Sequence, residues 1–197
     1  MNKRKAEVSR ETAETKISLS LDLDGSGKAD IQTGVPFFDH MLTLLARHSL
    51  FDLRVEATGD IQVDAHHTVE DVGICLGQAL SQAVGDKRGI NRYGFFLIPM
   101  EETLARVVLD LSGRALVVWR VDLAAEKCGD FDTCLGQEFF RALSSNAGIN
   151  IHVDLLAGGN PHHELEAVFK ALGRALRQAV TSDPREKGIP SSKNVLA

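Results

Sequence analysis

Two short stretches of the chain combine adjacent histidines with a glutamate. The first is His66-His67-x-x-Glu70, within DAHHTVED, and the second is His162-His163-x-x-Glu166, within NPHHELE. Imidazole and carboxylate groups without thiolates suit manganese, iron, zinc, cobalt or nickel better than calcium or magnesium. The two stretches therefore predict metal binding.

Helical geometry divides the ligands of each motif. If each motif opens a helix, the first histidine and the glutamate, at i and i+4, share one face. The adjacent histidines diverge by about 100° around the axis, since a helix has about 3.6 residues per turn. One small ion can hardly accept both of them. We therefore expect two metal ions, each receiving one histidine from each pair or from a neighbouring subunit, with a glutamate completing each set.

Two further histidines can complete the coordination. His40 lies in GVPFFDHML, at the start of a predicted helix, and His152 lies in the strand before the second motif. The candidates then divide into two sets of three histidines and one carboxylate: His40, His66, His67, Glu70, His152, His162, His163 and Glu166. His48 is left over near a predicted helix end, where the dipole favours an imidazolium and a purely structural role is the alternative.

Cationic and hydroxyl groups around these motifs are typical of phosphate binding. Lys170 follows His163 by seven residues, two helical turns, and so faces the same way. Arg92, Arg114 and the tail Ile189–Lys193 add groups that can hold a phosphate. A solvated helix face is the alternative for Lys170. The glycines match neither a Walker A nor a dinucleotide motif, so we expect neither ATP nor NAD as cofactor.

The elements that carry the motifs are duplicated. Shifting the chain by 96 positions superimposes HHTVEDVGICLGQALSQAV on HHELEAVFKALGRALRQAV, which predicts two related helices. Gly73 and Gly77 lie inside the first of them, where they allow close packing. Upstream of the motifs, Leu53–Ala57 and Ile149–Val153 alternate apolar with polar residues, as half-buried strands do.

Each half therefore predicts the order β-β-α-β-α. LDLDGSGKADIQ and LDLSGRALVVW each indicate two strands joined by a tight glycine-containing turn. Helices are predicted over Pro36–His48 and about Phe131–Ala147. The expected fold class is α/β or α+β, with helices on the faces of two sheets or half-sheets. We expect a single domain over residues 1–197, made of halves at about 1–95 and 96–197.

Composition excludes several classes of protein. The chain has 197 residues, a net charge of −5 and interspersed acidic and basic residues, which argues against nucleic-acid binding. It has no apolar run of membrane-spanning length, and its N-terminus lacks the apolar core of a signal peptide, so we expect a cytoplasmic protein. The three cysteines indicate neither a disulfide framework nor a cysteine zinc site.

Taken in order, these motifs resemble the imidazoleglycerol-phosphate dehydratase family of histidine biosynthesis. The similarity runs from about Ala6 to the C-terminus and rests on RETAETKI, LDLDGSG, GVPFFDHML, HSLFDL, DAHHTVED, GINRYG, LDLSGR, NPHHELEAVFKA and IPSSK. The resemblance implies a duplicated fold with helices packed on one side of a sheet and a monofunctional enzyme. It also implies a homo-oligomer of 24 chains with active sites where subunits meet.

The resemblance further implies the chemistry. A carbon–oxygen lyase of this family dehydrates D-erythro-imidazoleglycerol phosphate to imidazoleacetol phosphate and carries two manganese(II) ions per active site. The substrate ring, as an imidazolate, bridges the two ions and passes through a diazafulvene-like intermediate. The ions act as Lewis acids that stabilise the anionic ring.

The site residues carry over position by position. The eight candidate ligands match the family's metal ligands, and Glu70 and Glu166 count with Glu14 as catalytic carboxylates. Glu14, in AETKI, matches the acid/base at the substrate, although its residue pattern alone indicates an exposed strand position. The positions that match substrate or phosphate contacts are Glu14, His48, Arg92, Arg114, Lys170, Ser191, Ser192 and Lys193. Leu44 departs from a plant-type pattern that has glutamine there, which implies a smaller phosphate shell.

Three other classes could use similar residues. A dinuclear hydrolase could use the same ligands, but such sites usually contain several aspartates. A ferritin-like protein needs Glu-x-x-His on a four-helix bundle, the reverse of the order here. A non-catalytic metal-binding assembly would leave Glu14 and the tail without a purpose. Because ligands that point apart can be gathered only by neighbours, we also expect metal binding and assembly to be coupled.

Overall fold

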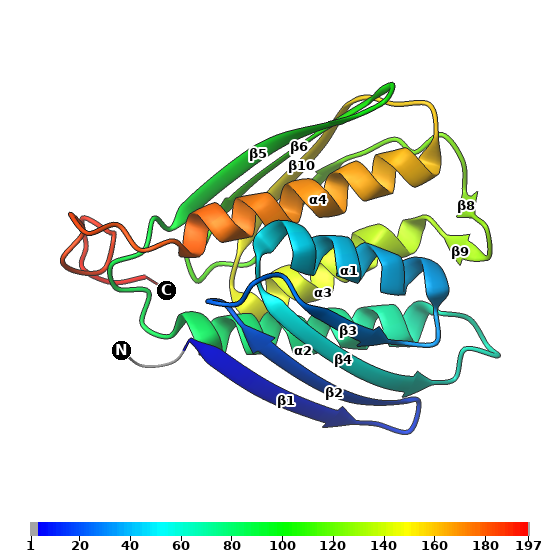
Figure 1. Cartoon of the computed structure of the whole chain (residues 1–197), viewed down its shortest axis with the longest axis horizontal. Helices are drawn as coiled ribbons and strands as arrows, with labels where there is room; N and C mark the ends of the chain where they lie inside the picture. The colour runs from blue at the N-terminus through cyan, green and yellow to red at the C-terminus, as the bar shows by residue number, and fades with distance from the viewer. Residues whose placement is uncertain (1–3, 197) are drawn as a thin grey trace.

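Two four-stranded sheets enclose four helices in the described part of the chain (Figure 1). The computed structural model describes residues 4–196. The first half contains β1 (Lys5–Glu11), β2 (Thr15–Asp22), β3 (Ala29–Gln32), α1 (Pro36–Ser49), β4 (Asp52–Gly59) and α2 (His66–Val84). The second contains β5 (Tyr93–Met100), β6 (Thr103–Asp110), β7 (Leu116–Arg120), β8 (Lys127–Cys128), β9 (Phe131–Asp132), α3 (Cys134–Ala147), β10 (Asn150–Ala157) and α4 (Pro161–Val180). No helix in this described range is both long and apolar enough to cross a membrane.

The duplicated mixed α/β architecture predicted from the sequence is confirmed, with an additional first strand in each half and a further short hairpin in the second. The first half runs β-β-β-α-β-α, because β1 precedes the predicted elements. The second half runs β-β-β-β-β-α-β-α, because β5 precedes the predicted elements and β8 and β9 precede α3. The sequence of β1, KAEVSRE, turns only Ala6 and Val8 inward and is otherwise polar. β5 contains Gly94 and Pro99, which normally argue against a strand, but it is an edge strand, where proline is tolerated.

The two predicted glycine turns do join strands, but those strands are not neighbours. The sheet orders are β1-β2-β4-β3 and β5-β6-β10-β7. β4 therefore inserts between β2 and β3 and pairs with β3 in parallel, and β10 does the same between β6 and β7. This correction follows from connectivity, since the strand that returns from a helix crossover pairs in parallel with the strand before it.

Each sheet buries one face under helices. On β2, Ile17, Leu19 and Leu21 point inward and are each 2% exposed. α2 packs against β1 and β2, and α4 packs against β5 and β6. The hydrophobic cluster draws on both halves, which is consistent with the predicted single domain. α3 begins at Cys134, later than predicted, because Phe131–Asp132 forms a short hairpin with Lys127–Cys128.

Glycines hold the helices in pairs. A Cβ added at Gly77 would lie 2.7 Å from the Leu143 carbonyl oxygen, and one at Gly173 would lie 2.8 Å from that of Leu45. These distances confirm the close packing predicted at the helix-interior glycines. α2 therefore packs on α3 and α4 on α1, and the first residues of all four helices gather at one end of the molecule (Figure 1).

The outer faces of the two sheets differ in polarity. Across the second sheet, Phe95, Val108, His152 and Val118 form one cross-strand row. The matching row of the first sheet is Ser9, Ser18, Glu56 and Gln32. The first sheet thus presents an ordinary solvated surface, whereas the second presents apolar side chains, with Phe95 56% and Leu116 50% exposed.

Candidate metal centre and substrate site

Three predicted ligands converge where α1 and α4 begin. His40 Nε2 lies 3.3 Å and His162 Nε2 lies 3.1 Å from the same Glu166 oxygen, Oε2. One ligand atom from each of the three residues lies within 4.8 Å of the others. The Asn160 side chain accepts a hydrogen bond from the backbone N–H of His162 and so caps α4 immediately before these ligands. Two imidazoles and one carboxylate at this spacing can hold a transition-metal ion.

Lys170 neutralises the carboxylate of this cluster. Its Nζ lies 2.5 Å from Glu166 Oε1, one turn along α4. Burial raises the pKa of Glu166, but hydrogen bonds from Lys170 and His40 outweigh it, and the net pKa is lower than usual. Lys170 therefore lies beside the predicted ligands, and its ion-pair partner is Glu166. Its spacing of seven residues from His163 had predicted a position on this side of the helix.

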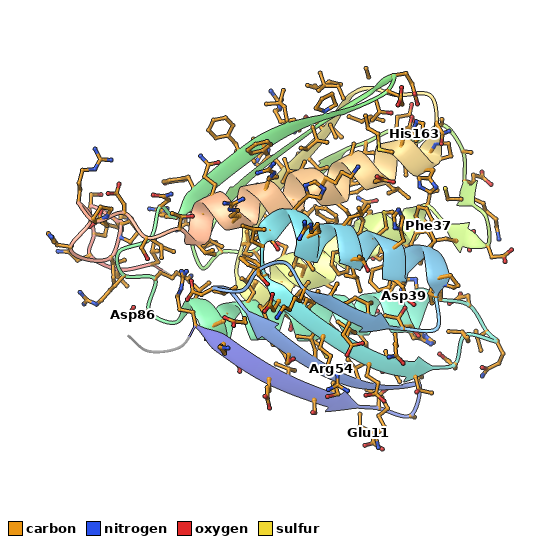
Figure 2. All side chains as sticks on the ribbon, viewed as in Figure 1. Glu11, Phe37, Asp39, Arg54, Asp86 and His163 are labelled. Carbon is orange, nitrogen blue, oxygen red and sulfur yellow. The ribbon has the colours of Figure 1, made fainter. Side chains whose placement is uncertain are left out.

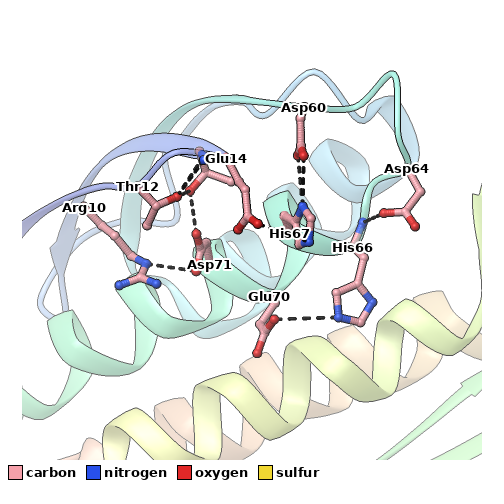
Figure 3. Close-up of polar contacts among 10 residues, drawn as sticks. Arg10, Thr12, Glu14, Asp60, Asp64, His66, His67, Glu70 and Asp71 are labelled. Carbon is pink, nitrogen blue, oxygen red and sulfur yellow. Dashed lines mark hydrogen bonds and ion pairs between the residues drawn. The ribbon is translucent and has the colours of Figure 1, made fainter.

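The first motif repeats this arrangement more loosely. His66 Nε2 lies 3.7 Å from Glu70 Oε2 (Figure 3). The Asp64 carboxylate accepts from the backbone N–H of His66 at 2.7 Å, in the position that Asn160 takes before α4. Both motifs thus open their helices, and the i, i+4 pairing of histidine and glutamate that the sequence predicted is confirmed.

The second histidine of each pair turns to a different partner. The ring planes cross at 85° for His66 and His67 and at 84° for His162 and His163. His67 Nδ1 lies 3.0 Å from Asp60, whose hydrogen bond raises the pKa of His67. His163 Nδ1 lies 3.2 Å from Glu102. Adjacent histidines therefore diverge as predicted, and each pair offers ligands in two directions.

Glu14 lies in the turn between β1 and β2, which corrects the strand position its residue pattern indicated. Its carboxylate is 3.9 Å from His67 Nε2. The Thr12 hydroxyl accepts from the backbone N–H groups of Glu14 and Thr15 at 3.1 and 3.0 Å and so closes the turn. Asp71, on α2, accepts from the Thr15 hydroxyl at 2.5 Å and ties the turn to the helix of the first motif (Figure 3).

Apart from Lys170, the candidate phosphate-binding residues lie at the opposite end of the molecule. The Arg92 guanidinium pairs with both Asp110 oxygens at 2.7 and 2.9 Å and donates to the Pro190 carbonyl at 2.9 Å. This contact brings in the tail that contains the remaining candidates, Ser191, Ser192 and Lys193. Arg114 lies exposed in the turn that follows β6. The Arg92 backbone N–H donates to the carbonyl of Ala179, near the end of α4.

One chain cannot bring these two groups to one small substrate. Ala179 follows His163 by 16 residues of the same helix, α4. At about 1.5 Å per residue, this separates their backbones by about 24 Å along the axis. Figure 2 shows His163 at the end of the molecule away from the tail. The predicted site is therefore completed only if more than one chain contributes to it.

His48 does not behave as the helix position alone suggested. It lies in the last turn of α1. Burial lowers its pKa, and the cations Lys170, Arg174 and Arg47 lower it further. The pKa of His48 is thus lowered, the opposite of the direction expected from the helix dipole, so burial and these cations favour the neutral ring.

His152 does not join the His40 cluster of its own chain. It lies on the outer face of the second sheet, between Val108 and Val118, whereas the helices cover the inner face. Only a neighbouring chain that docks on this face could use it. As a metal ligand, His152 stays a prediction.

The internal repeat reveals a carboxylate that sequence reasoning missed. Gly173 contacts Leu45, His48 and Ser49, and Gly77 makes the equivalent contacts to Leu143, Asn146 and Ala147. These contacts align α3 with α1 at a shift of 98 residues. Glu138 therefore takes the position in the second helix pair that His40 takes in the first. It is half-buried and pairs with Arg141. The sequences of α1 and α3 are too different to show that Glu138 corresponds to His40. The helix contacts are needed to establish it.

A cavity of about 830 Å³ adjoins the cluster. His40 and His162 line one wall, and the loop that contains Ile61, Val63 and Asp64 lines another. This loop leads into the first histidine motif, so the cavity extends from His162 to the residues directly before His66. It is large enough for a small phosphorylated metabolite.

Comparison with known proteins agrees with these features. Residues 33–176 match the family model of imidazoleglycerol-phosphate dehydratase. Proteins of that name from Ruegeria pomeroyi and Paracoccus denitrificans are 60% and 59% identical, each over 98% of this chain and 100% of the relative. The crystal structure of the Staphylococcus aureus enzyme covers 91% of this chain and 99% of its own, with 46% identity and a TM-score of 0.83. The crystal structure of the Pyrococcus furiosus enzyme has 35% identity and a TM-score of 0.84. The match covers 96% of this chain and 100% of the Pyrococcus furiosus chain. The resemblance seen in the motifs is confirmed: the chain belongs to the imidazoleglycerol-phosphate dehydratase family, whose members are lyases of histidine biosynthesis.

Proposed function

We propose that this chain dehydrates D-erythro-imidazoleglycerol phosphate to imidazoleacetol phosphate in a manganese-dependent reaction. The observation that carries the proposal is the convergence of His40, His162 and Glu166 in one half and the repeated His66 and Glu70 arrangement in the other. Family membership supports the reaction, and the donor atoms support the metal.

The residues fit manganese(II) ions. His40, His162 and Glu166 offer two imidazole nitrogens, one carboxylate and no thiolate. The two histidines line the cavity, from which substrate could reach an ion held there. His66 and Glu70 would hold a second ion with histidines from another chain, either His152 or His163, while Glu138 offers a further carboxylate. His67, which turns in another direction, would serve an ion shared with a neighbouring chain. When bound, the two ions would supply Lewis-acid stabilisation of negative charge on the substrate ring.

Glu14 is the proposed proton carrier. The reaction removes a hydroxyl group from one carbon and a proton from its neighbour, and the resulting enol becomes the ketone of the product. The Glu14 carboxylate is 3.9 Å from His67 Nε2, on a turn held by Thr12 and Asp71, so it borders the proposed ligands. In this position it can give a proton to the departing hydroxyl group, which leaves as water, and then accept the carbon-bound proton, without binding the ions itself.

Complete sites are proposed to form between chains, in an assembly of 24. The separation of about 24 Å between the ligands and the Arg92 group along α4 supports sharing, because a single chain presents only half of what the substrate needs. The apolar outer face of the second sheet, which also presents His152, supplies a surface for such contacts. Arg92, Arg114, Ser191, Ser192 and Lys193 of one chain would then hold the phosphate of a substrate bound at a neighbour's ligands, where Lys170 and His48 also lie.

The proposal is tested by turnover. Purified protein is incubated with imidazoleglycerol phosphate and either manganese or EDTA, and imidazoleacetol phosphate is measured. Manganese-dependent product is expected. Absence of product from a folded, fully metallated assembly would contradict the proposed activity and favour a metal-binding assembly or a hydrolase.

Glu14→Gln separates the catalytic role from a structural one. Removing the base should lower kcat by about 10²–10⁴-fold, the usual range for a general acid or base, with metal content and assembly unchanged. Metal content and particle mass are measured beside kcat. A variant that lost its metal or its assembly would contradict the role given to Glu14. Glu11→Gln, at an exposed position three residues earlier, is the control and should keep full activity.

A further inference from the structure

The two sheets each deliver a glutamate to the histidine motif of their own half. Glu14 directly precedes Thr15, the first residue of β2, and Glu102 directly precedes Thr103, the first residue of β6. Both threonines are buried, at 3% and 2% exposure. The two glutamates therefore occupy equivalent turns in the duplicated fold.

These equivalent glutamates approach different nitrogens of the second histidine. Glu102 places both carboxylate oxygens 3.2 Å from Nδ1 of His163. Glu14 instead lies 3.9 Å from Nε2 of His67. The Nδ1 atom of His67 is occupied by Asp60, whose oxygens lie 3.1 and 3.0 Å away.

The hydrogen-bond chemistry of these contacts determines the tautomer. An ionised carboxylate can only accept a hydrogen bond, so the imidazole must donate from Nδ1. In the neutral ring, Nε2 then has the free lone pair that a metal ion needs. His67 and His163 are therefore held in the same tautomer, protonated on Nδ1. The two carboxylates that hold them, Asp60 and Glu102, do not occupy equivalent positions in the duplicated fold.

We propose that Asp60 and Glu102 are positioning residues that hold His67 and His163 with Nε2 facing a metal ion. This inference rests on the proposed metal-dependent function and deepens it. It also explains why the equivalent glutamates have separate tasks. Glu102 accepts a hydrogen bond from Nδ1 of His163. Asp60 accepts from Nδ1 of His67, so Glu14 remains on the Nε2 side of that ring, where the substrate would be.

A backbone contact couples the two carboxylates of the first half. The Asp60 N–H donates to the Glu14 carbonyl at 3.1 Å. Asp60 thus touches both the ring of His67 and the turn that carries Glu14. Among the described residues, the only other side-chain hydrogen bond of Glu102 is a long one, from the Thr103 hydroxyl at 3.4 Å. Glu102 therefore gives the cleaner test.

The test measures manganese(II) affinity and turnover of the full chain. Glu102→Ala should weaken manganese binding by about 10–100-fold, the usual effect of removing the carboxylate behind a ligating histidine. Glu102→Gln should weaken it less, because its amide oxygen still accepts from Nδ1. Glu101→Ala, at the exposed neighbouring position, is the matched control and should bind as the unsubstituted chain does.

Cobalt(II) provides a readout that a purely structural role would not alter. Its visible absorption reports ligand geometry, and we expect a changed spectrum for Glu102→Ala at unchanged melting temperature and particle mass. Equal metal affinity and an identical cobalt spectrum in Glu102→Ala would overturn the inference while the unsubstituted chain remains active. An unsubstituted chain that neither binds manganese nor forms product would instead overturn the proposed function, and this inference with it. If Glu102→Ala does not fold, Glu102→Gln and Asp60→Asn supply the same comparison.

Discussion

At the residue scale, the same side-chain type has different surroundings in the two halves. His162 lies with His40 and Glu166 around one small volume, whereas in the described part of the chain no third ligand group joins His66 and Glu70. The difference arises because α1 contributes a histidine at the position where α3 contributes Glu138. Identical motifs therefore need not produce identical sites, because a site also depends on the residue that the neighbouring helix contributes.

Lys170, together with His40, lowers the pKa of Glu166 in the metal-free protein. The pKa of Glu166 is held below its ordinary value of 4.5, so the carboxylate stabilises the fold at higher pH. That contribution is lost as pH falls from 4.5 through the lower folded value. In Lys170→Met the remaining burial raises the pKa, so the free energy of unfolding should depend less steeply on pH in this window.

Urea unfolding of the metal-free protein at a series of acidic pH values measures this effect. Lys16→Met is the control, because Lys16 and its partner Glu11 are 73% and 70% exposed. A surface pair of this kind contributes little to stability. Equal slopes for Lys170→Met and the unsubstituted chain would show that Lys170 does not control Glu166.

At the element scale, close contacts between helices align the ends that carry the ligands. α2 and α3 approach through Gly73 and Gly77, and α1 and α4 approach through Gly173. Each pair brings two helix starts to the same end of the molecule, so residues from both helices reach one site. The strand order works in the same way, since inserting β4 beside β2 places the loop with Asp60 beside the turn with Glu14.

Adding one methyl group at a helix crossing should therefore be harmful. In Gly77→Ala the new Cβ would lie 2.7 Å from both the Leu143 carbonyl oxygen and the Asn146 Cβ. Overpacking of this kind costs about 1–3 kcal/mol. Alanine favours an isolated helix by about 1 kcal/mol over glycine, so a net loss of stability must come from the crossing.

Thermal and urea unfolding measure the Gly77→Ala effect. Gly188→Ala is the control, because nothing lies within 4 Å of the added Cβ, and it should leave stability nearly unchanged. Gly77→Ala with stability equal to or above that of the unsubstituted chain would mean that α2 and α3 can separate without cost.

At the scale of the whole molecule, the two ends of the helices have different chemistry. Candidate metal ligands lie where the helices begin, and the cationic residue Arg92 and the tail lie where α4 ends. The outer face of the second sheet exposes apolar side chains, which is unfavourable in water. Under the proposed function, a single chain would therefore lack part of the site.

A charge placed on that face should disrupt assembly. Val108→Asp introduces a carboxylate in the row that contains Phe95, His152 and Val118, and burying this charge among apolar side chains between chains would be costly. We expect smaller particles by light scattering and loss of most activity. Ser18→Asp, on the matching row of the first sheet, should keep the particle size. Val108→Asp particles of unchanged mass would show that the interfaces lie elsewhere.

The sequence by itself determined the features that depend on short separations along the chain. The i, i+4 pairs of His66 with Glu70 and His162 with Glu166, the helices that begin at them and the duplication follow from spacing and periodicity. Helical geometry translates those separations directly into positions on one face. The same reasoning predicted that adjacent histidines diverge, as their ring planes do.

Only the tertiary structure decided which distant residues meet. Asp60 and Glu102 contact His67 and His163 because a loop and a hairpin fold back over helix starts, and no local pattern encodes those contacts. The placement of His152 on an outer face likewise depends on which side of the sheet the helices cover. The strand order of each sheet also depends on a crossover that pairs strands far apart in sequence. These features are set by packing of the whole chain, because one apolar face must be buried against another before any of them is defined.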